Sequence, residues 1–93
     1  MHNYELTVVL DGKATAAKKT AVTKTIEKVI ELGKGKLGKV SEWGVKDLAY
    51  KIGKNTTGSY IFFTLSIEPS FVKQLDNKLK MEENIIRFLV VKE

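Results

Sequence analysis

The side chains that could support catalysis or bind a metal are few in this sequence, and they stand apart from one another. His2 is the only histidine, and no acidic cluster shares metal-ligand spacing with it. The chain has no cysteine, which excludes disulfides, thiol chemistry and thiolate metal sites. Its serines have no neighbouring base and no G-x-S-x-G elbow around them. The sequence therefore offers no catalytic nucleophile, no metal site and no cofactor site.

One short stretch matches a phosphate-binding pattern letter by letter. "GKGKLG", Gly33 to Gly38, fits G-x-G-x-x-G, the pattern that cradles a dinucleotide pyrophosphate when a strand precedes it and a helix follows. Here a helix is expected to end and a strand to begin, so no helix N-terminus would face the phosphate. We interpret these glycines as a helix cap and a turn, with Gly33 as the left-handed cap residue.

The balance of charge points to a class of partner. The 93 residues include 16 basic and 11 acidic ones, a formal charge of +5 that favours polyanionic partners. All but one of the basic residues are lysines, which suit phosphate contact better than base reading. The lysines along the second predicted strand and its turns are Lys34, Lys36, Lys39, Lys46, Lys51 and Lys54. They either protect an edge strand from association or contact phosphate, and we favour phosphate contact.

Hydrophobic periodicity predicts the elements that position these side chains. Alternating apolar residues predict a strand over residues 4–10, and apolar residues at helical spacing predict a helix over residues 15–32. One long strand is expected from Lys36 to about Ile52, with a bend or bulge near Gly44. "KNTTG", at residues 54–58, predicts a turn into the next strand.

The second half of the chain contains two strands around a helix. "SYIFFTLSI" predicts a strand whose core residues are Ile61, Phe63, Leu65 and Ile67. Pro69 begins an amphipathic helix that runs to Lys80. "IIRFLVV" predicts the last strand. Alternation places Ile86, Phe88 and Val90 on its core face, and Ile85, Arg87, Leu89 and Val91 on its other face.

The order strand, helix, strand, strand, helix, strand predicts an α+β fold of the ferredoxin-like, split βαβ type. Its four-stranded antiparallel sheet would carry both helices on one face. With 43% hydrophobic residues the chain can build one core, so we expect a single domain over residues 1–93. The longest apolar run, Phe88 to Val91, is too short to cross a membrane, and no signal peptide is evident. We expect an intracellular protein.

The helix-free face of the predicted sheet is expected to display Tyr60, Phe62, Arg87 and Leu89. Tyr60 and Phe62 could stack on bases as the aromatic residues of RNA-recognition motifs do. The basic residue and second glycine of that signature are missing, so sheet packing or a protein contact remain alternatives.

Four stretches of the chain together match one known family. They are "YEL", "GKVSEWGVKDLAYKI", "GSYIFF" and "LKMEENIIRFLVVK". With them the chain resembles bacterial small ribosomal subunit protein six over nearly its whole length. The resemblance implies a non-enzymatic protein of the cytoplasmic ribosome that joins small-subunit protein eighteen and binds the central domain of 16S ribosomal RNA. It implies no cofactor, no small-molecule substrate and no membrane partner.

The resemblance also implies which residues lie on the RNA and partner surfaces. They are Tyr4, Lys46, Lys54, Tyr60, Phe62, Lys80, Arg87 and Lys92. The second-strand lysines Lys36, Lys39 and Lys51 complete the predicted site. Lys51 replaces the proline usual in the family after L-A-Y, and Asp47 stands where a second basic residue is common. Asp47 therefore weakens the expectation of phosphate contact at Lys46.

The stretch "EWGVKDLAYKI" combines two roles in this interpretation. Trp43, Leu48 and Tyr50 are expected to be packing anchors at alternating positions, while Lys46 and Lys51 remain available to a partner.

Two other classes of function stay open at this stage. An enzyme of the acylphosphatase type would need an arginine in a phosphate-cradling loop after the first strand. The corresponding stretch, "DGKATAA", supplies Lys13 but no arginine. A standalone RNA-binding or regulatory domain of the same fold is the other alternative.

Overall fold

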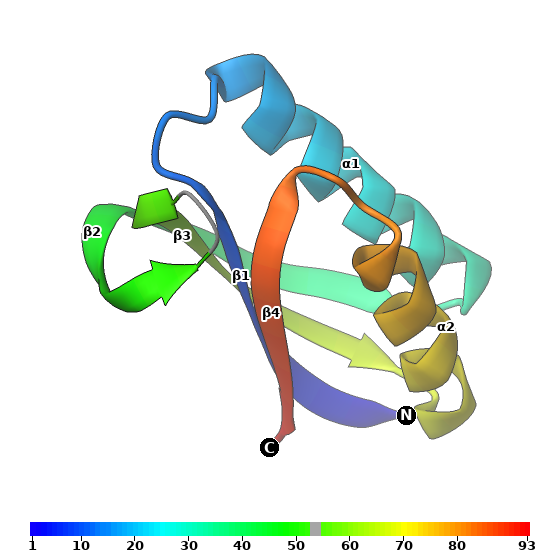
Figure 1. The fold of residues 1–93 in the computed structure, drawn as a ribbon. Coiled ribbons are helices and arrows are strands. Elements are labelled where there is room, and N and C mark those ends of the chain that lie inside the picture. Colours follow the sequence, from blue (N-terminus) through cyan, green and yellow to red (C-terminus); the bar gives the residue numbers. More distant parts are fainter. Residues whose placement is uncertain (53–54) are drawn as a thin grey trace.

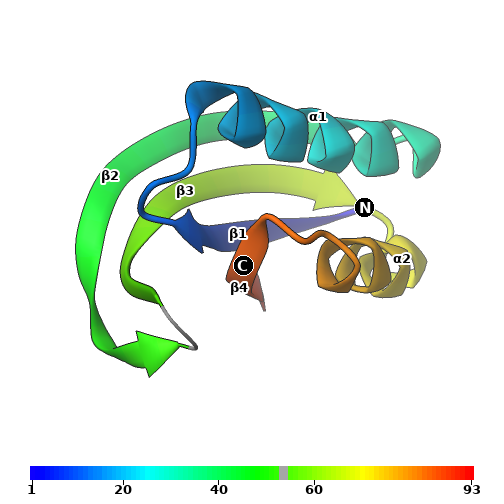
Figure 2. The same ribbon diagram turned by 45° about the horizontal axis from the view of Figure 1, so that its top comes forward.

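The structure is a computed structural model that describes the backbone of residues 1–52 and 55–93 and the side chains of residues 1–47 and 57–93. Its elements are β1 (His2–Asp11), α1 (Ala16–Leu32), β2 (Lys36–Ile52), β3 (Asn55–Ile67), α2 (Pro69–Lys80) and β4 (Ile85–Lys92). The sheet has the order β2-β3-β1-β4 and every neighbouring pair is antiparallel. Both helices cover the same face (Figures 1 and 2). The predicted ferredoxin-like α+β fold is confirmed.

The core lies between the sheet and the two helices because alternate strand residues point to the helix side. All four predicted core residues of β3 are at most 3% exposed. The buried residues that meet them are Leu6, Val8 and Leu10 from β1, Val22, Ile26, Val29 and Ile30 from α1, and Leu75 and Leu79 from α2. Neither helix of the described chain has both the length and the apolar character needed to cross a membrane.

The glycines after α1 serve close packing. Gly33 has φ −84° and Lys34 has φ 56°, so the left-handed residue is Lys34 and the prediction for Gly33 is wrong. A Cβ on Gly33 would stand 2.8 Å from the Phe71 ring, and one on Gly35 would overlap the Ser66 carbonyl oxygen. At this junction α1 ends and β2 begins, so the glycine pattern has no helix N-terminus to offer a phosphate.

Strand β2 is long and bent, as predicted. Its register against β3 shifts between Leu37 and Val40, between Glu42 and Gly44, and between Asp47 and Ile52. Gly44 has φ 83°, which a glycine adopts without steric cost. The predicted turn is wrong for residues 55–58, which belong to β3. The bent β2 continues far enough to pair with them, for example Lys46 with Gly58.

Strand β4 departs from simple alternation at its start. Val9 pairs with Arg87 but Leu10 pairs with Ile85, so Ile86 is an extra residue in the ladder. Ile85 therefore packs against the core with Phe88 and Val90, and the predicted face of Ile85 is wrong. From Arg87 onward the register is regular.

Candidate functional site

An aromatic cluster lies on the helix-free face of the sheet. The rings of Trp43 and Phe62 stack with their centroids 5.3 Å apart and their planes 12° apart. Tyr60 lies two residues from Phe62 along β3 and points to the same face. Trp43 follows Glu42, which pairs with the core residue Ile61, so the Trp43 side chain points to this face. It packs on Phe62 but is 48% exposed, so the predicted packing anchor lies on the helix-free face and not in the core.

Lys46 points into this cluster. Its Nζ lies 5.4 Å from the centroid of the Trp43 ring and 5.9 Å from that of Tyr60. These are cation–π distances, in which the negative ring faces attract the ammonium group. Lys46, Trp43, Tyr60 and Phe62 therefore form one contiguous polar and aromatic surface.

The surface continues across the sheet to β4. Val9 of β1 pairs with Tyr60 on one side and with Arg87 on the other, so these three side chains form a row across the face. The next row is Phe62, Thr7 and Leu89. Because neighbouring strands are about 4.8 Å apart, Arg87 lies roughly 10 Å from Tyr60. We call Trp43, Lys46, Tyr60, Phe62, Arg87 and Leu89 the open-face patch.

Two further predicted lysines lie near the start of β2. Lys36 pairs with Ser66 and lines a shallow hollow with Asn3 and Thr64. Lys39 is exposed beside the first irregularity of β2, where its backbone N–H donates to Thr64 Oγ1 at 2.7 Å. Both lie nearer the start of β2 than Trp43, which β2 contributes to the aromatic cluster from the middle of the strand.

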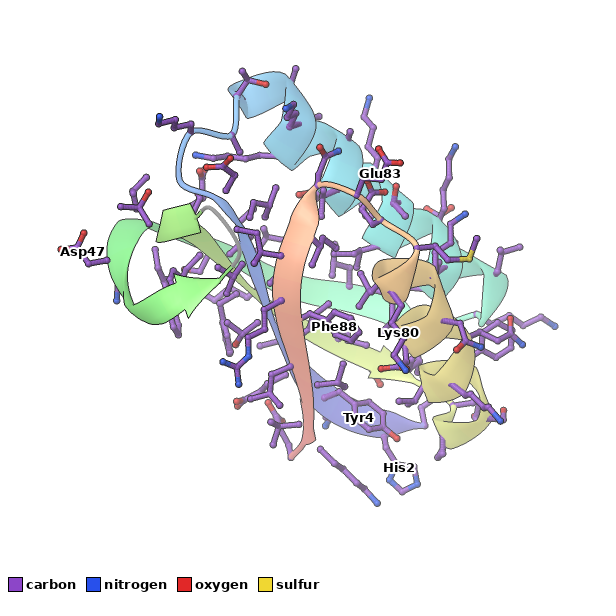
Figure 3. The ribbon with its side chains drawn as sticks, in the orientation of Figure 1. His2, Tyr4, Asp47, Lys80, Glu83 and Phe88 are labelled. Atoms are coloured by element: carbon purple, nitrogen blue, oxygen red, sulfur yellow. The ribbon has the colours of Figure 1, made fainter. Side chains whose placement is uncertain are left out.

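The remaining predicted residues lie elsewhere on the molecule (Figure 3). Tyr4 is on the helix-covered face and only 6% exposed. Lys92 pairs with it and lines a groove between α2 and β4. Lys80 is on α2, where its Nζ forms an ion pair with Asp76 at 2.9 Å. The side chains of Lys51 and Lys54, like those of Leu48 and Tyr50, lie outside the described residues.

Asp47 lies at the curved end of β2 and is exposed (Figure 3). Consecutive strand residues point to opposite faces, so its carboxylate lies on the other side of β2 from Lys46. Across the described chain, His, Asp and Glu side chains form no group of three that could hold a metal ion. The open-face patch is thus suited to binding by stacking and charge.

Comparison with known proteins identifies the family. A sequence model of the family Ribosomal protein S6 matches residues 3–92, almost the whole chain. The chain belongs to the ribosomal protein S6 family. The family resemblance inferred from the sequence is confirmed.

Relatives of the S6 family align along most of the chain. Small ribosomal subunit protein bS6 of Streptomyces griseus is 34% identical over 92 residues, which cover 99% of this chain and 96% of that protein. The Clostridioides difficile bS6 is 34% identical and covers 98% of each. The Rickettsia canadensis bS6 is 45% identical over 65 residues, and this match spans only 54% of that relative's length.

A solved S6 structure has the same fold. The crystal structure of 30S ribosomal protein S6 from Thermotoga maritima superimposes with a TM-score of 0.89 and covers 99% of this chain and 87% of that one. At 24% sequence identity this likeness supports the fold alone. Membership of the S6 family makes this chain a structural protein of the small subunit of the cytoplasmic ribosome and not an enzyme. The acylphosphatase alternative is therefore wrong.

Sequence reasoning did not include Trp43 in the predicted site. The signal available for it was Gly38, earlier in the same predicted strand, because a glycine inside a strand often marks a bulge. A bulge reverses the alternation of faces, so an aromatic residue beyond it cannot be assigned to the core from its position alone.

Proposed function

We propose that this protein binds the central domain of 16S ribosomal RNA together with small-subunit protein eighteen and supports assembly of the small subunit. The observation that carries the proposal is the open-face patch, in which aromatic rings and cationic groups share one helix-free surface. In this proposal residues 1–93 act as a single domain. The two components of the surface have separate physical roles.

The cationic groups of the patch supply contacts to phosphate. Each lysine that neutralises a phosphate releases condensed counterions, which contributes favourable and salt-dependent free energy. Arg87 adds a planar guanidinium that can bind a phosphate through two hydrogen bonds or stack on a base. Neither contribution requires catalysis.

The open-face patch also exposes apolar side chains, which contact with phosphate does not require. Trp43 is 48% exposed and Leu89 is 60% exposed, and Val91 on the same strand is 46% exposed. Aromatic and aliphatic groups that remain exposed together commonly mark a protein–protein contact. This supports a protein partner that covers part of the face while RNA contacts the cationic groups.

The test is a binding titration of a central-domain RNA fragment with this protein, with and without protein eighteen. Binding to the RNA should be at least about tenfold tighter with the partner present, the size of a typical coupling free energy. Trp43→Ala should weaken the ternary complex, whereas Leu32→Ala should not. Leu32 is 74% exposed at the end of α1 and serves as a matched apolar control.

Equal RNA affinity with and without the partner would instead favour the standalone RNA-binding alternative. Equal loss in the Trp43 and Leu32 variants would contradict the assignment of the surface to the open-face patch. Circular dichroism of both variants checks that neither one has lost the fold.

A further inference from the structure

The outer edge of β4 carries unpaired backbone groups. Among the described strands of the sheet, β4 has β1 as its only neighbour. Alternate residues of an edge strand direct their N–H and C=O groups away from the sheet. Among the described residues, residues 88–92 take part in no backbone hydrogen bond outside the sheet ladder. This edge can therefore accept another strand.

The two edges of the sheet differ in how well they could pair with an added strand. The opposite edge, β2, has three register irregularities and is bent at Gly44, which disfavours continuous pairing with another strand. From Arg87 to Lys92, β4 is regular and contains neither proline nor an acidic residue. Leu89 and Val91 are exposed on it. A strand of six residues would extend about 20 Å along this edge.

A groove lies beside the same edge, between β4 and α2. Tyr4, Phe88 and Val90 contribute to it from the sheet, and Pro69 and Val72 contribute from α2. Figure 3 shows Tyr4 and Phe88 in the space between β4 and α2. Side chains of a strand point alternately to the two faces of a sheet, so every second side chain of an added strand would enter this groove. An edge strand flanked by a helix is a recurrent peptide-binding arrangement.

The charges at the groove select the partner. Lys73 and Lys92 line it and are exposed, and neither forms an ion pair within the described chain. Asp76, the one acidic residue among the described residues that line it, is paired with Lys80 at 2.9 Å. A second copy of this chain is disfavoured, because its own β4 would bring further basic residues and its net charge is +5.

We propose that β4 and the α2–β4 groove bind an extended, acidic segment of a partner protein, which adds to the sheet as a fifth strand. Every second side chain of that segment would enter the groove. Apolar side chains there would pack against Phe88 and Val90, and acidic ones would lie near Lys73 and Lys92. This surface adjoins the open-face patch, which includes Arg87 and Leu89 of β4. Peptide binding can be measured without RNA, so the inference does not depend on the proposed RNA binding.

The test uses a fluorescent eight-residue peptide in which every second residue, on the side that would face the groove, is valine or glutamate, and the residues between them are threonine. Two further versions carry N-methyl groups on every second amide, one on the odd-numbered residues and the other on the even-numbered residues. In an added strand only one of these two sets of amides faces β4. The version methylated on that set should not bind, and the other should bind like the parent peptide. Fluorescence anisotropy measures the binding, with neither RNA nor protein eighteen present.

Matched protein variants test the charge selection. Lys73→Glu should weaken peptide binding about fivefold, the scale of exposed charge pairs. Lys78→Glu should change it less than about twofold, because Lys78 is an exposed lysine of the same helix but does not line the groove. A peptide with lysine in place of glutamate should bind more weakly than the parent.

Amide hydrogen exchange locates the contact. The parent peptide should slow exchange at alternate residues between Arg87 and Lys92 and leave β2 unchanged. The inference is overturned if the peptide slows exchange at β2 instead of β4, or if both methylated peptides bind equally well. It is also overturned if the parent peptide shows no saturable binding up to about 1 mM, which corresponds to a binding free energy of about −4 kcal/mol. It is also overturned if a single-stranded oligonucleotide protects the same β4 amides, because the surface would then be a general anion site.

Discussion

At the scale of single residues, Trp43 shows how an irregularity earlier in a strand can change the side of the sheet on which a residue lies. Strict alternation from the core residue Leu37 would place it on the helix-covered face. The register shift between Leu37 and Val40 reverses this, so Trp43 lies on the helix-free face, where it stacks on Phe62 and contacts Lys46. No pattern of hydrophobicity could reveal this, because the change comes from the way β2 pairs with β3.

Arg87 should contribute more to RNA binding than an ordinary surface lysine. We expect Arg87→Ala to weaken the RNA complex about tenfold or more, since hydrogen bonds to charged groups contribute about 1.5–3 kcal/mol. Lys78→Ala, far from the open-face patch on α2, should change the affinity less than about twofold. Titrations at fixed salt measure both.

Arg87→Lys separates the two properties of the side chain. It keeps the charge and removes the planar fork, so it should recover only part of the lost affinity. Full recovery would show that charge alone matters at this position, and equal losses in the Arg87 and Lys78 alanine variants would contradict the assignment.

Ser59 contains a hydroxyl that the fold does not use. Its side chain is fully buried, and its Oγ has no hydrogen-bond partner in the described chain. Burial of an unpaired polar group costs about 1–3 kcal/mol, so Ser59→Ala should leave the free energy of unfolding unchanged or raise it by up to about 1 kcal/mol. Urea unfolding measures the change.

Thr64 provides the comparison, because its Oγ1 accepts a hydrogen bond from the backbone N–H of Lys39. Thr64→Val should lower the free energy of unfolding by about 0.5–1.5 kcal/mol, the net contribution of one such bond. A larger loss for Ser59→Ala than for Thr64→Val would mean that the Ser59 hydroxyl has a partner after all.

At the scale of elements, the sequence predicts where helices and strands occur better than how the strands pair. The alternation of Ile61, Phe63, Leu65 and Ile67 is uninterrupted and identifies the core face of β3 correctly. Ile85 lies on the core face and not on the predicted open face, because one extra residue in the β1–β4 ladder breaks the alternation. Bulges depend on contacts between strands distant in sequence, so the periodicity of one strand cannot locate them.

The glycines at the ends and bends of elements differ in how much space a side chain would have there. A Cβ on Gly35 would overlap the Ser66 carbonyl oxygen and the Ile67 side chain, whereas one on Gly44 would meet nothing within 4 Å. Gly35→Ala should therefore lower the free energy of unfolding by about 2–3 kcal/mol through overpacking. Gly44→Ala should lower it by about 1–2 kcal/mol through its positive φ alone.

Chemical denaturation of both variants checks this order. If Gly44→Ala lowers the free energy of unfolding more than Gly35→Ala does, the backbone at the bend of β2 is more tightly constrained than the open space around Gly44 indicates. Gly44→Asn serves as a control, because asparagine tolerates a positive φ and should recover part of the loss.

At the scale of the whole molecule, net charge and family resemblance predict the class of partner, while the fold decides which predicted residues act together. Tyr60, Phe62, Lys46 and Arg87 come from three strands and meet on one face. Tyr4 and Lys92, which match the same family pattern, lie at the α2–β4 groove. Position in a motif therefore does not determine on which surface a residue lies, because each strand presents two faces.

The salt dependence of RNA binding should separate the charged and aromatic parts of the open-face patch. The logarithm of affinity should fall linearly with the logarithm of salt concentration, with a slope of about 0.7–0.9 for each phosphate neutralised. Lys46→Ala removes one such contact and should reduce the slope by about that amount.

Trp43→Ala should behave differently, because stacking releases no counterions. It should lower the affinity by about 1–3 kcal/mol at every salt concentration and leave the slope unchanged. If instead Trp43→Ala changes the slope as much as Lys46→Ala does, the ring acts mainly by positioning the Lys46 ammonium 5.4 Å above it. The two titrations therefore decide whether the aromatic cluster binds RNA directly or orients the charge that does.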